Sequence, residues 1–529
     1  MSRKKNKPTP VLPRKMRDQV EAIAMAICLA IGLKYFLVEA YEIPTPSMQP
    51  TMMGSREAGV HDRILVDKAV FLRRDPRRFD VAIFRYPLNR AQNYVKRIVG
   101  LPGEHLTIIG GDVWRITAAE DGGPAHYECL RKPDVVQAGL WRRLWDSAEA
   151  EQPDRAWLRP IGRWRADGQA VVVEDTSRGA EATFEPHGRD GALLLVNRYE
   201  HGYPAAIIDA VRKEAPELSG APRVVGDLRW RLTLVPDEAT TGVELALDLG
   251  YVQGTARVDL GRHEARLCLT PGAGGRAVAQ LAVDRVPRSR GGDEAREQVG
   301  SVELSDVTWR PGAEVEVELV RLDGGITARV GGQSLGTLVP PWKGEPVPVA
   351  SVALSMTVRG AKALRVERAT LDRDLYYTNK LDHPDYQSEV HVPAGHFWML
   401  GDNTQNSADG RAWKRFTVHV DAEGRLVDAR APLPAGGRAI SGGLRFHGHK
   451  PVIDPDENPV LVAGKNALVV TDLWGEEHAV RVDGQPDPVD AFQRLARFED
   501  DLFVPRDYVI GKAFAAFWPV SPFRIGLIR

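Results

Sequence analysis

The segment EIPTPSMQPTM, residues 42–52, encloses a serine between prolines a few residues after an apolar stretch. Pro44 and Pro46 each fix a backbone φ angle and favour extended conformations at the residues that precede them. We therefore expect Ser47 to lie exposed in a stiff, non-helical segment, with its backbone N–H available to a ligand. Taken alone, the segment is more typical of a proline-rich spacer, so a chemical role for Ser47 requires a partner elsewhere in the chain.

The composition narrows the class of protein. The chain has 529 residues, enough for about two to four domains. Lys and Arg number 70 against 71 Asp and Glu, so there is no basic surplus of the kind that nucleic-acid binding requires. The 50 Gly and 37 Pro favour a protein of strands and turns. Cys28, Cys129 and Cys268 allow at most one disulfide, and their spacing is not that of a metal site.

The N-terminus combines charge and apolarity. Residues 1–18 are strongly basic, with Asp18 as their single acidic residue, and the apolar run Ala22–Leu33 resumes after Lys34. A cleaved signal peptide, a buried amphipathic helix and a membrane anchor of about 20 residues all fit this pattern. We favour the anchor, because no small-x-small cleavage site with a polar break ends the run. The basic flank then keeps the N-terminus in the cytoplasm.

Three short β-branched runs follow, at Arg63–Lys68, Asp80–Tyr86 and Asn93–Val99. In the third run, alternation places Lys96 on the face of Tyr94 and Ile98. Apolar surroundings disfavour a charged ammonium group and lower its pKa, which a lysine acting as a general base requires. The alternative is a surface Lys-Arg pair on an edge strand.

The middle of the chain contains no recognisable catalytic or metal-binding motif. Residues 116–224 hold no recognisable motif, whereas short strands recur over residues 227–372 at the spacing of an all-β sandwich. Two of them are expected at Thr255–Leu260 and Ala265–Leu269. The pattern resembles a laminin-G or concanavalin-like jelly roll. An interaction or carbohydrate-binding role and a purely structural insertion both remain open.

Four segments, taken in order, resemble the characteristic boxes of type I signal peptidases. They are PSMQPT around Ser47, the strand DVAIFRYP at 80–87, YVKRIVGLPG around Lys96, and GDNTQNSADGR at 401–411, which follows the apolar run His396–Leu400. The resemblance covers roughly residues 20–115, 390–415 and 504–519, behind the basic and apolar N-terminus.

The resemblance implies a serine endopeptidase, signal peptidase I, with a Ser-Lys dyad. Ser47 is the expected nucleophile and Lys96 the base that takes its proton and later activates water. The expected oxyanion hole consists of the Ser47 N–H and the Thr45 hydroxyl.

The same resemblance assigns the supporting residues. Ser407 is expected to orient Lys96, while Asp409 and Arg411 hold the loop. Ile43 and Val95 are expected to line the substrate pockets for small side chains before the cleavage site. No cofactor and no metal are implied.

We therefore expect a mainly β protein with an antiparallel β catalytic core, an N-terminal membrane helix and an inserted β-sandwich. The expected division is a basic cytoplasmic tail 1–18, an anchor 19–41, core 42–115, an insert of unknown type 116–225, the sandwich 226–372, core 373–416, a second insertion 417–500 and a C-terminal core strand 501–529. The implied location is the inner (plasma) membrane, crossed once, with the catalytic domain on the periplasmic face. The implied partners are the signal peptides of exported preproteins and the lipid bilayer, together with any ligand of the sandwich.

The sequence also departs from the family pattern. Thr404 and Gln405 replace the usual Arg-Asp, Gly410 replaces a serine, and the link Gly54–His61 is long, so we expect altered loop packing and a functional dyad. Two alternatives remain: a self-cleaving Ser-Lys peptidase of the same fold, as in SOS-response repressors, and a membrane-tethered binding protein without catalysis.

Overall fold

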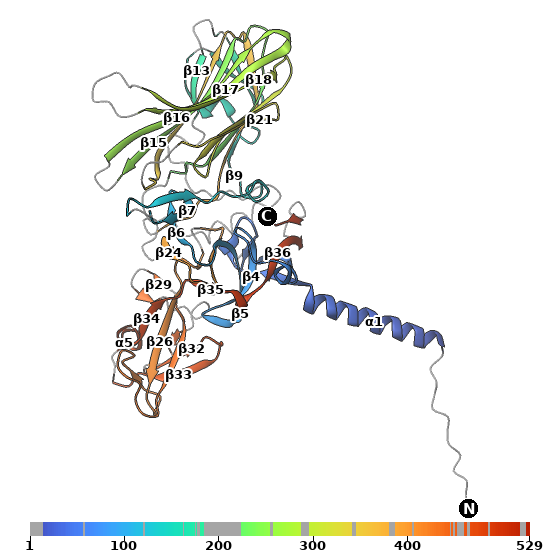
Figure 1. Cartoon of the computed structure of the whole chain (residues 1–529). Coiled ribbons are helices and arrows are strands. Elements are labelled where there is room, and N and C mark those ends of the chain that lie inside the picture. Colours follow the sequence, from blue (N-terminus) through green and yellow to red (C-terminus); the bar gives the residue numbers. More distant parts are fainter. Residues whose placement is uncertain are drawn as a thin grey trace, which may run out of the picture.

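The computed structural model describes residues 14–56, 59–119, 122–161, 163–174, 176, 180–184, 224–253, 258–286, 296–340, 345–379, 387–404, 407–444, 446–447, 450–451, 460–462, 466–484, 487–518 and 525–528. The protein is mainly β, as the composition predicts. A sandwich, a central body and a smaller third body follow one another along the long axis, and one helix projects to the side (Figure 1). All three cysteines are free thiols.

The central body is built on the sheet β1-β3-β36-β4-β5-β25-β35, with β2 paired to β3 and β37 to β36. Its strands are β1 (Val38–Ile43), β2 (Gly54–Ser55), β3 (Val60–Asp67), β4 (Val81–Tyr86), β5 (Asn89–Gly100), β25 (His396–Leu400), β35 (Phe503–Pro505), β36 (Val509–Trp518) and β37 (Gly526–Leu527). The strands expected between residues 63 and 99 are thus present as β3, β4 and β5. Strand β36, from the end of the chain, lies between β3 and β4.

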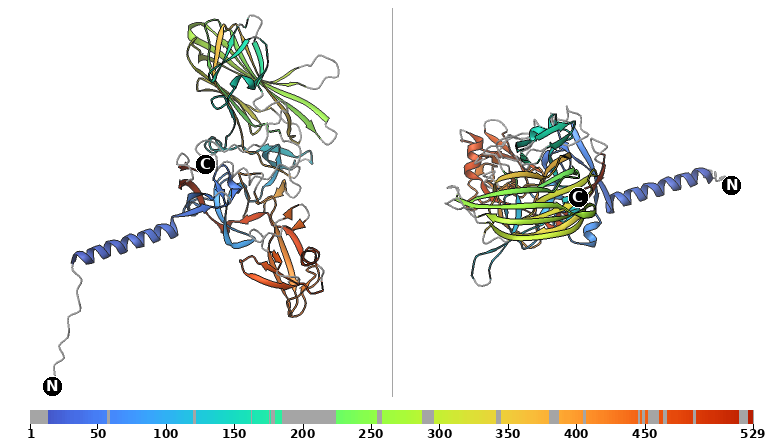
Figure 2. Two further views of the ribbon diagram at one scale, coloured as in Figure 1. Left: turned by 180° about the vertical axis from the view of Figure 1, so that it is seen from behind. Right: turned by 90° about the horizontal axis from the view of Figure 1, so that it is seen from above.

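In both views of Figure 2, the N-terminal helix α1 (Arg14–Phe36) projects away from the rest of the molecule. The expected helix 19–41 is wrong at its end, because Val38–Ile43 forms β1 instead. This segment pairs along its whole length with β3, from Val38 opposite Asp67 to Ile43 opposite Asp62. The backbone hydrogen bonds and the burial of Ile43 favour the strand. No helix within the described ranges is both long and apolar enough to cross a membrane.

A small sheet, β24-β6-β7-β8, lies between the central sheet and the sandwich (Figure 1). It consists of β6 (His105–Ile109), β7 (Asp112–Thr117), β8 (His126–Cys129) and β24 (Glu389–His391). Its apolar residues Leu106 and Ile108 pack with Trp398 and Leu400 of β25 in one buried cluster. The sheet therefore joins the central body to the insertion.

The insertion is formed by two sheets that share one hydrophobic core, in which Trp230, Leu245 and Leu319 are buried. The first sheet consists of β10 (Trp157–Ile161), β13 (Ala180–Phe184), β22 (Val349–Arg359), β15 (Gly242–Gln253), β16 (Val258–Pro271), β17 (Arg276–Val286) and β18 (Glu297–Thr308). The second consists of β11 (Arg163–Asp167), β12 (Ala170–Glu174), β23 (Ala363–Arg373), β14 (Leu228–Val235), β19 (Val315–Leu322), β20 (Gly325–Val330), β21 (Gln333–Leu338) and β9 (Arg142–Asp146).

Two expectations for the insertion need correction. The expected strand Ala265–Leu269 and residues 258–260 of the expected strand Thr255–Leu260 belong to the single strand β16, which pairs with β15 across a bulge; residues 255–257 lie outside the described residues. The described strands of the segment 116–225 do not form a separate insert, because β8 joins the small sheet and β9 to β13 join the two sheets of the sandwich. Their few residues cannot bury a core alone, whereas the faces of β12 and β13 pack into the shared one. The likeness to a laminin-G-type jelly roll stays a prediction.

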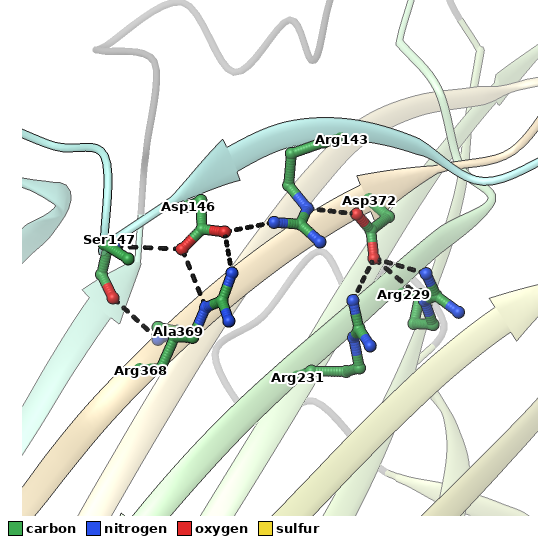
Figure 3. Close-up of polar contacts among 9 residues, drawn as sticks. Arg143, Asp146, Ser147, Arg229, Arg231, Arg368, Ala369 and Asp372 are labelled. Atoms are coloured by element: carbon green, nitrogen blue, oxygen red, sulfur yellow. Dashed lines mark hydrogen bonds and ion pairs between the residues drawn. The ribbon is translucent and has the colours of Figure 1, made fainter. Parts of the chain in front are cut away.

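Strand β9 is fastened to the sandwich by ion pairs (Figure 3). Arg143 contacts both Asp146 and Asp372, with its Nε 2.5 Å from Asp372 Oδ1. Arg229 reaches the other Asp372 oxygen at 2.8 Å, and Arg368 reaches Asp146 at 2.6 Å. The start of β9, at Arg142, is therefore held in a defined position relative to the sandwich.

The third body comprises the described residues of the expected second insertion and has a core of its own, which contains Phe416, Ile440 and Phe492. Its elements are β26 (Lys414–Val420), β27 (Leu426–Val427), β28 (Arg438–Leu444), β29 (Phe446–His447), β30 (Lys450–Pro451), β31 (Val460–Val462), β32 (Ala467–Thr471), β33 (Glu477–Arg481), α5 (Pro488–Leu495) and β34 (Arg497–Asp500). Short helical turns elsewhere are α2 (Val70–Arg73), α3 (Asp134–Gln137), η1 (Pro46–Met48), η2 (Pro153–Ala156), η3 (Ala273–Gly275) and η4 (Arg506–Tyr508).

Candidate active site

The serine segment forms a turn of 3₁₀ helix, η1, between β1 and β2. The expectation of an exposed, non-helical serine is therefore wrong at two points: Ser47 is inside this turn, and only 9% of it is exposed. Proline is favoured at the first position of a helix, where Pro46 stands, and Thr45 before it is extended as a residue preceding proline should be. Met48, which is fully buried, anchors the turn in the core with Met52.

The side chain of Lys96, on β5, contacts the side chain of Ser47 in this turn. Lys96 Nζ donates a hydrogen bond to Ser47 Oγ over 2.5 Å, and Lys96 is only 3% exposed. Lys96 Nζ lies 5.7 Å from the centre of the Tyr94 ring, so the two residues share a face of β5. The structure thus brings together a hydroxyl and a buried amine from segments that are 49 residues apart.

Two hydrogen-bond donors lie near Ser47 Oγ. Thr45 Oγ1 is 3.5 Å from it. Ser47 is the second residue of η1, where an N–H has no acceptor within its own helix. Both groups can therefore donate a hydrogen bond, and their role as an oxyanion hole stays a prediction.

The loop after β25 holds the serine turn directly. Asn403 donates its backbone N–H to Ser47 O at 3.1 Å and its side-chain amide to Pro46 O at 3.0 Å. Sequence reasoning gave Asn403 no role, although it lies inside the 401–411 box. Its position explains why an amide is suited there, since it donates twice to carbonyl groups of the turn.

Asp402 and Arg97 form a pair that sequence reasoning also missed. Arg97 Nε and Nη2 bind the two Asp402 oxygens at 2.8 and 2.6 Å, and neither side chain is exposed. Thr51 adds a hydrogen bond to Asp402 Oδ2 at 2.5 Å. Burial raises the pKa of Asp402, but the charge and hydrogen bonds of Arg97 outweigh it and hold that pKa below its ordinary value.

A side chain of the insertion, Arg142, is hydrogen-bonded to the group formed by Thr51, Asp402 and Arg97. Arg142, the first residue of β9, donates from Nη2 to Thr51 Oγ1 at 2.7 Å. Thr51 belongs to the serine box, and its hydroxyl in turn donates a hydrogen bond to Asp402 Oδ2. A hydrogen-bonded chain therefore connects the sandwich to the strand that carries Lys96.

Asp409 and Arg411 hold the loop itself. Arg411 binds Asp409 through Nε at 2.8 Å and Nη2 at 2.6 Å, and both are fully buried. Asp409 Oδ2 also accepts the Gly401 N–H at 2.9 Å, while Arg411 Nη1 donates to Thr378 Oγ1 at 2.8 Å. Burial raises the pKa of Asp409, but Arg411 overcomes this and keeps it below the ordinary range.

Ser407 and Gly401 lie against the serine turn. A Cβ atom on Gly401 would stand 2.1 Å from Ser407 Oγ and 2.4 Å from Ser47 O. Ser407 is 4% exposed, and its role in orienting Lys96 stays a prediction. At Gly410, a Cβ would stand 2.7 Å from Leu502 O, so the family's usual serine would not fit there without a shift. Of the two other departures, Thr404 is buried, and Gln405 lies outside the described residues.

Ile43 and Val95 pack in the same apolar cluster beneath the turn, together with Met48 and Ile83. Ile43 is 3% exposed, whereas Val95 is partly exposed at the cluster's edge. Both therefore lie in the cluster that contains Met48, the residue after Ser47, and substrate binding by them stays a prediction.

Comparison with known proteins points to one family. The family described as "Signal peptidase, peptidase S26" matches residues 16–119 and 344–427. The signal peptidase I of Leptolyngbya laminosa is 32% identical over 159 residues, which are 26% of this chain and 72% of that protein. The signal peptidase I of Pseudomonas aeruginosa is 31% identical over 185 residues, which are 30% of this chain and 63% of that protein.

Among solved structures, the carbohydrate recognition domain of Emp46p in its potassium-bound form is similar to 44% of this chain and 97% of its own. The sequence identity is 8% and the TM-score 0.26. A likeness at that level supports no assignment for the sandwich.

Proposed function

Since this chain belongs to the signal peptidase S26 family, we propose that it is a serine endopeptidase that removes signal peptides from exported preproteins. The observation that carries the proposal is the 2.5 Å contact between Ser47 Oγ and the buried Lys96 Nζ. A hydroxyl is a weak nucleophile until a neighbouring base takes its proton, and an amine in its neutral form is such a base. Burial at this depth disfavours the ammonium form.

The proposed chemistry proceeds through an acyl-enzyme. Neutral Lys96 takes the Ser47 proton while Oγ attacks the scissile carbonyl carbon, and the negative charge moves to the carbonyl oxygen. The Ser47 N–H and the Thr45 hydroxyl stabilise that oxygen. The C–N bond then breaks, and protonated Lys96 gives its proton to the leaving amine.

Deacylation uses the same two side chains. Lys96, neutral again, takes a proton from water, and the resulting hydroxide attacks the ester carbonyl. The Ser47–acyl bond breaks, and Lys96 returns the proton to Ser47 Oγ. The signal peptide leaves with a new carboxylate, and both residues regain their starting states.

Substrate and location belong to the same proposal. The apolar edge formed by Ile43 and Val95 suits small side chains before the cleavage site. Helix α1 leaves apolar side chains such as Ile23, Met25 and Leu29 more than half exposed. A lipid surface would cover them, so we place the chain at the inner membrane through α1, with its catalytic body on the periplasmic side.

The direct test is cleavage of a preprotein by Ser47→Ala and Lys96→Ala. Each should lose activity on the order of 10⁴-fold or more while its circular dichroism spectrum stays unchanged. The exposed Ser301→Ala and Lys362→Ala are matched controls and should cleave like wild type. Cleavage at the wild-type rate by either dyad variant would overturn the proposal.

A pH–rate profile tests the role of Lys96 independently. Because the base must be neutral, kcat/KM should rise with pH as Lys96 loses its proton. A rate that stays flat from neutral pH to about pH 10, near the ordinary titration of lysine, would exclude Lys96 as the base.

A further inference from the structure

Four buried aspartates meet where the sandwich joins the small sheet. One carboxylate oxygen from each of Asp112, Asp227, Asp323 and Asp374 lies within 4.8 Å of the other three. Asp112 begins β7 of the small sheet, whereas the other three stand at the ends of sandwich strands: Asp227 before β14, Asp323 between β19 and β20, and Asp374 after β23. The cluster therefore spans the junction between the two bodies.

Two cationic side chains compensate part of this charge. Lys132 contacts Asp323 and lies 2.8 Å from Asp374 Oδ2, while Arg321 contacts Asp227. Both cations are themselves largely buried. Two cations thus face four carboxylates, three of which they contact, so two negative charges are left uncompensated, and burying such charges is costly.

Two polar groups at the cluster have vacant acceptor sites. No described residue donates a hydrogen bond to the Asp112 side chain or forms an ion pair with it, although Asp112 is only 5% exposed. Gln137 is 4% exposed and donates from Nε2 to Asp374 Oδ1 at 2.6 Å. Its Oε1 accepts no hydrogen bond from the described residues. A bound cation would satisfy the oxygen atoms of both groups.

We propose that Asp112, Asp227, Asp323 and Asp374, with Gln137 Oε1, bind a divalent cation of the Ca²⁺ type that fastens the sandwich to the small sheet. Ca²⁺ takes about six to eight oxygen ligands at about 2.3–2.6 Å. Ligands on opposite sides of the ion are then about 4.6–5.2 Å apart, so oxygen atoms within 4.8 Å of one another are close enough to share one ion. Carboxylate and amide oxygens are the donors that such a hard cation prefers.

A proton is the competing occupant. Burial, followed by the charge of Asp227, raises the pKa of Asp112 well above its ordinary value. A protonated Asp112 would remove one of the uncompensated charges without any metal. The two occupants differ in what stabilises the junction, since only a bound cation makes stability depend on Ca²⁺ at constant pH.

The experiment uses the full chain, stripped with EDTA and exchanged into metal-free buffer. Calorimetric titration with Ca²⁺ at pH 7.5 should give one equivalent, and millimolar Ca²⁺ should raise the Tm by about 3–8 °C. Tb³⁺ gives a second readout, because Trp114 lies beside the Asp323–Gly324 turn, where a Cβ on Gly324 would be 3.8 Å from Trp114 Cη2. Tryptophan-sensitised Tb³⁺ emission should appear and be displaced by Ca²⁺.

Asp112→Asn locates the site. It removes one ligand charge, so Ca²⁺ should bind at least about 10-fold more weakly, while the metal-free Tm should equal or exceed that of wild type. Asp306→Asn, an exposed sandwich aspartate (71% exposed), is the matched control and should keep the wild-type response. Wild type without binding heat, Tm shift or Tb³⁺ emission at 10 mM cation would assign the site to a proton and overturn the proposal. A Ca²⁺ response that persists unchanged in Asp112→Asn would also overturn it.

Discussion

Arg97 and Asp402 form a two-point ion pair with no exposed surface, directly beside the contact between Ser47 and Lys96. The arginine follows Lys96 on β5, and the aspartate begins the loop that binds the serine turn through Asn403. The pair therefore sets the distance between the strand that carries the proposed base and the loop that holds the proposed nucleophile.

Removing one partner of this pair should be more harmful than removing both. Asp402→Asn leaves the Arg97 charge buried without compensation, and we expect a loss of about 3–5 kcal/mol in the free energy of unfolding. The double variant Arg97→Met/Asp402→Leu should lie closer to wild type, because no charge is stranded. Urea denaturation measures both, and a double variant less stable than Asp402→Asn would contradict this account.

The same pair predicts how stability depends on pH. Because the pKa of Asp402 is lower in the folded than in the unfolded protein, its ionised form stabilises the fold above about pH 4, the ordinary aspartate value. That contribution is lost as the pH falls further, through the folded-state pKa. The Tm difference between wild type and Asp402→Asn should thus be constant from pH 7 to about 5 and shrink below about 4. A Tm difference between the two proteins that does not change down to pH 3 would contradict the lowered pKa of Asp402.

The insertion should influence catalysis through Arg142. Arg142→Met removes the donor to Thr51 Oγ1 and should lower kcat by about 5- to 100-fold with the dyad intact, because small displacements near a nucleophile are costly. Arg165→Met is the matched control, since Arg165 pairs with Glu174 on the exposed face of the sandwich. Equal activities of the two variants in preprotein cleavage would show that the insertion does not position the site.

Gly401 should tolerate no side chain. In Gly401→Ala the new Cβ would overlap Ser47 O and Ser407 Oγ, so the turn must shift. We expect a loss of activity of about 10²-fold or more with a modest change in Tm. Gly526→Ala, where a Cβ meets nothing within 4 Å, provides the control. Full activity of Gly401→Ala in the same cleavage assay would mean that the position of the turn is not critical.

Local patterns in the sequence predicted the strands around the site well. Strand β25 has the expected bounds 396–400, and Lys96 shares a face of its strand with Tyr94, because alternation along a strand is a local property. The expectation that the prolines keep the segment around Ser47 non-helical was wrong at Pro46, and the reason is also local. Proline restricts the residue before it but is itself compatible with the first turn of a helix.

The pairing of Ser47 with Lys96 followed from the family resemblance, whereas other contacts between distant segments could not be predicted from the sequence. Arg97 and Asp402 are 305 residues apart, and Arg142 and Thr51 are 91 apart, so no periodicity connects them. The same holds for the four aspartates at the sandwich junction, which come from four separate turns. Strands β9 to β13 were not recognised as sandwich strands, because only their partners in the later sequence complete the core.

Strand β36 lies between β3 and β4, although it comes last in the chain among the long strands of that sheet. The halves of the sheet that carry Ser47 and Lys96 are thus joined by residues 509–518. During synthesis the proposed nucleophile and base are made long before β36, yet their sheet cannot close until residues 509–518 have been made. A chain interrupted anywhere before β36 would accordingly lack the strand that joins the two halves, so the topology itself makes the proposed activity depend on the synthesis of β36.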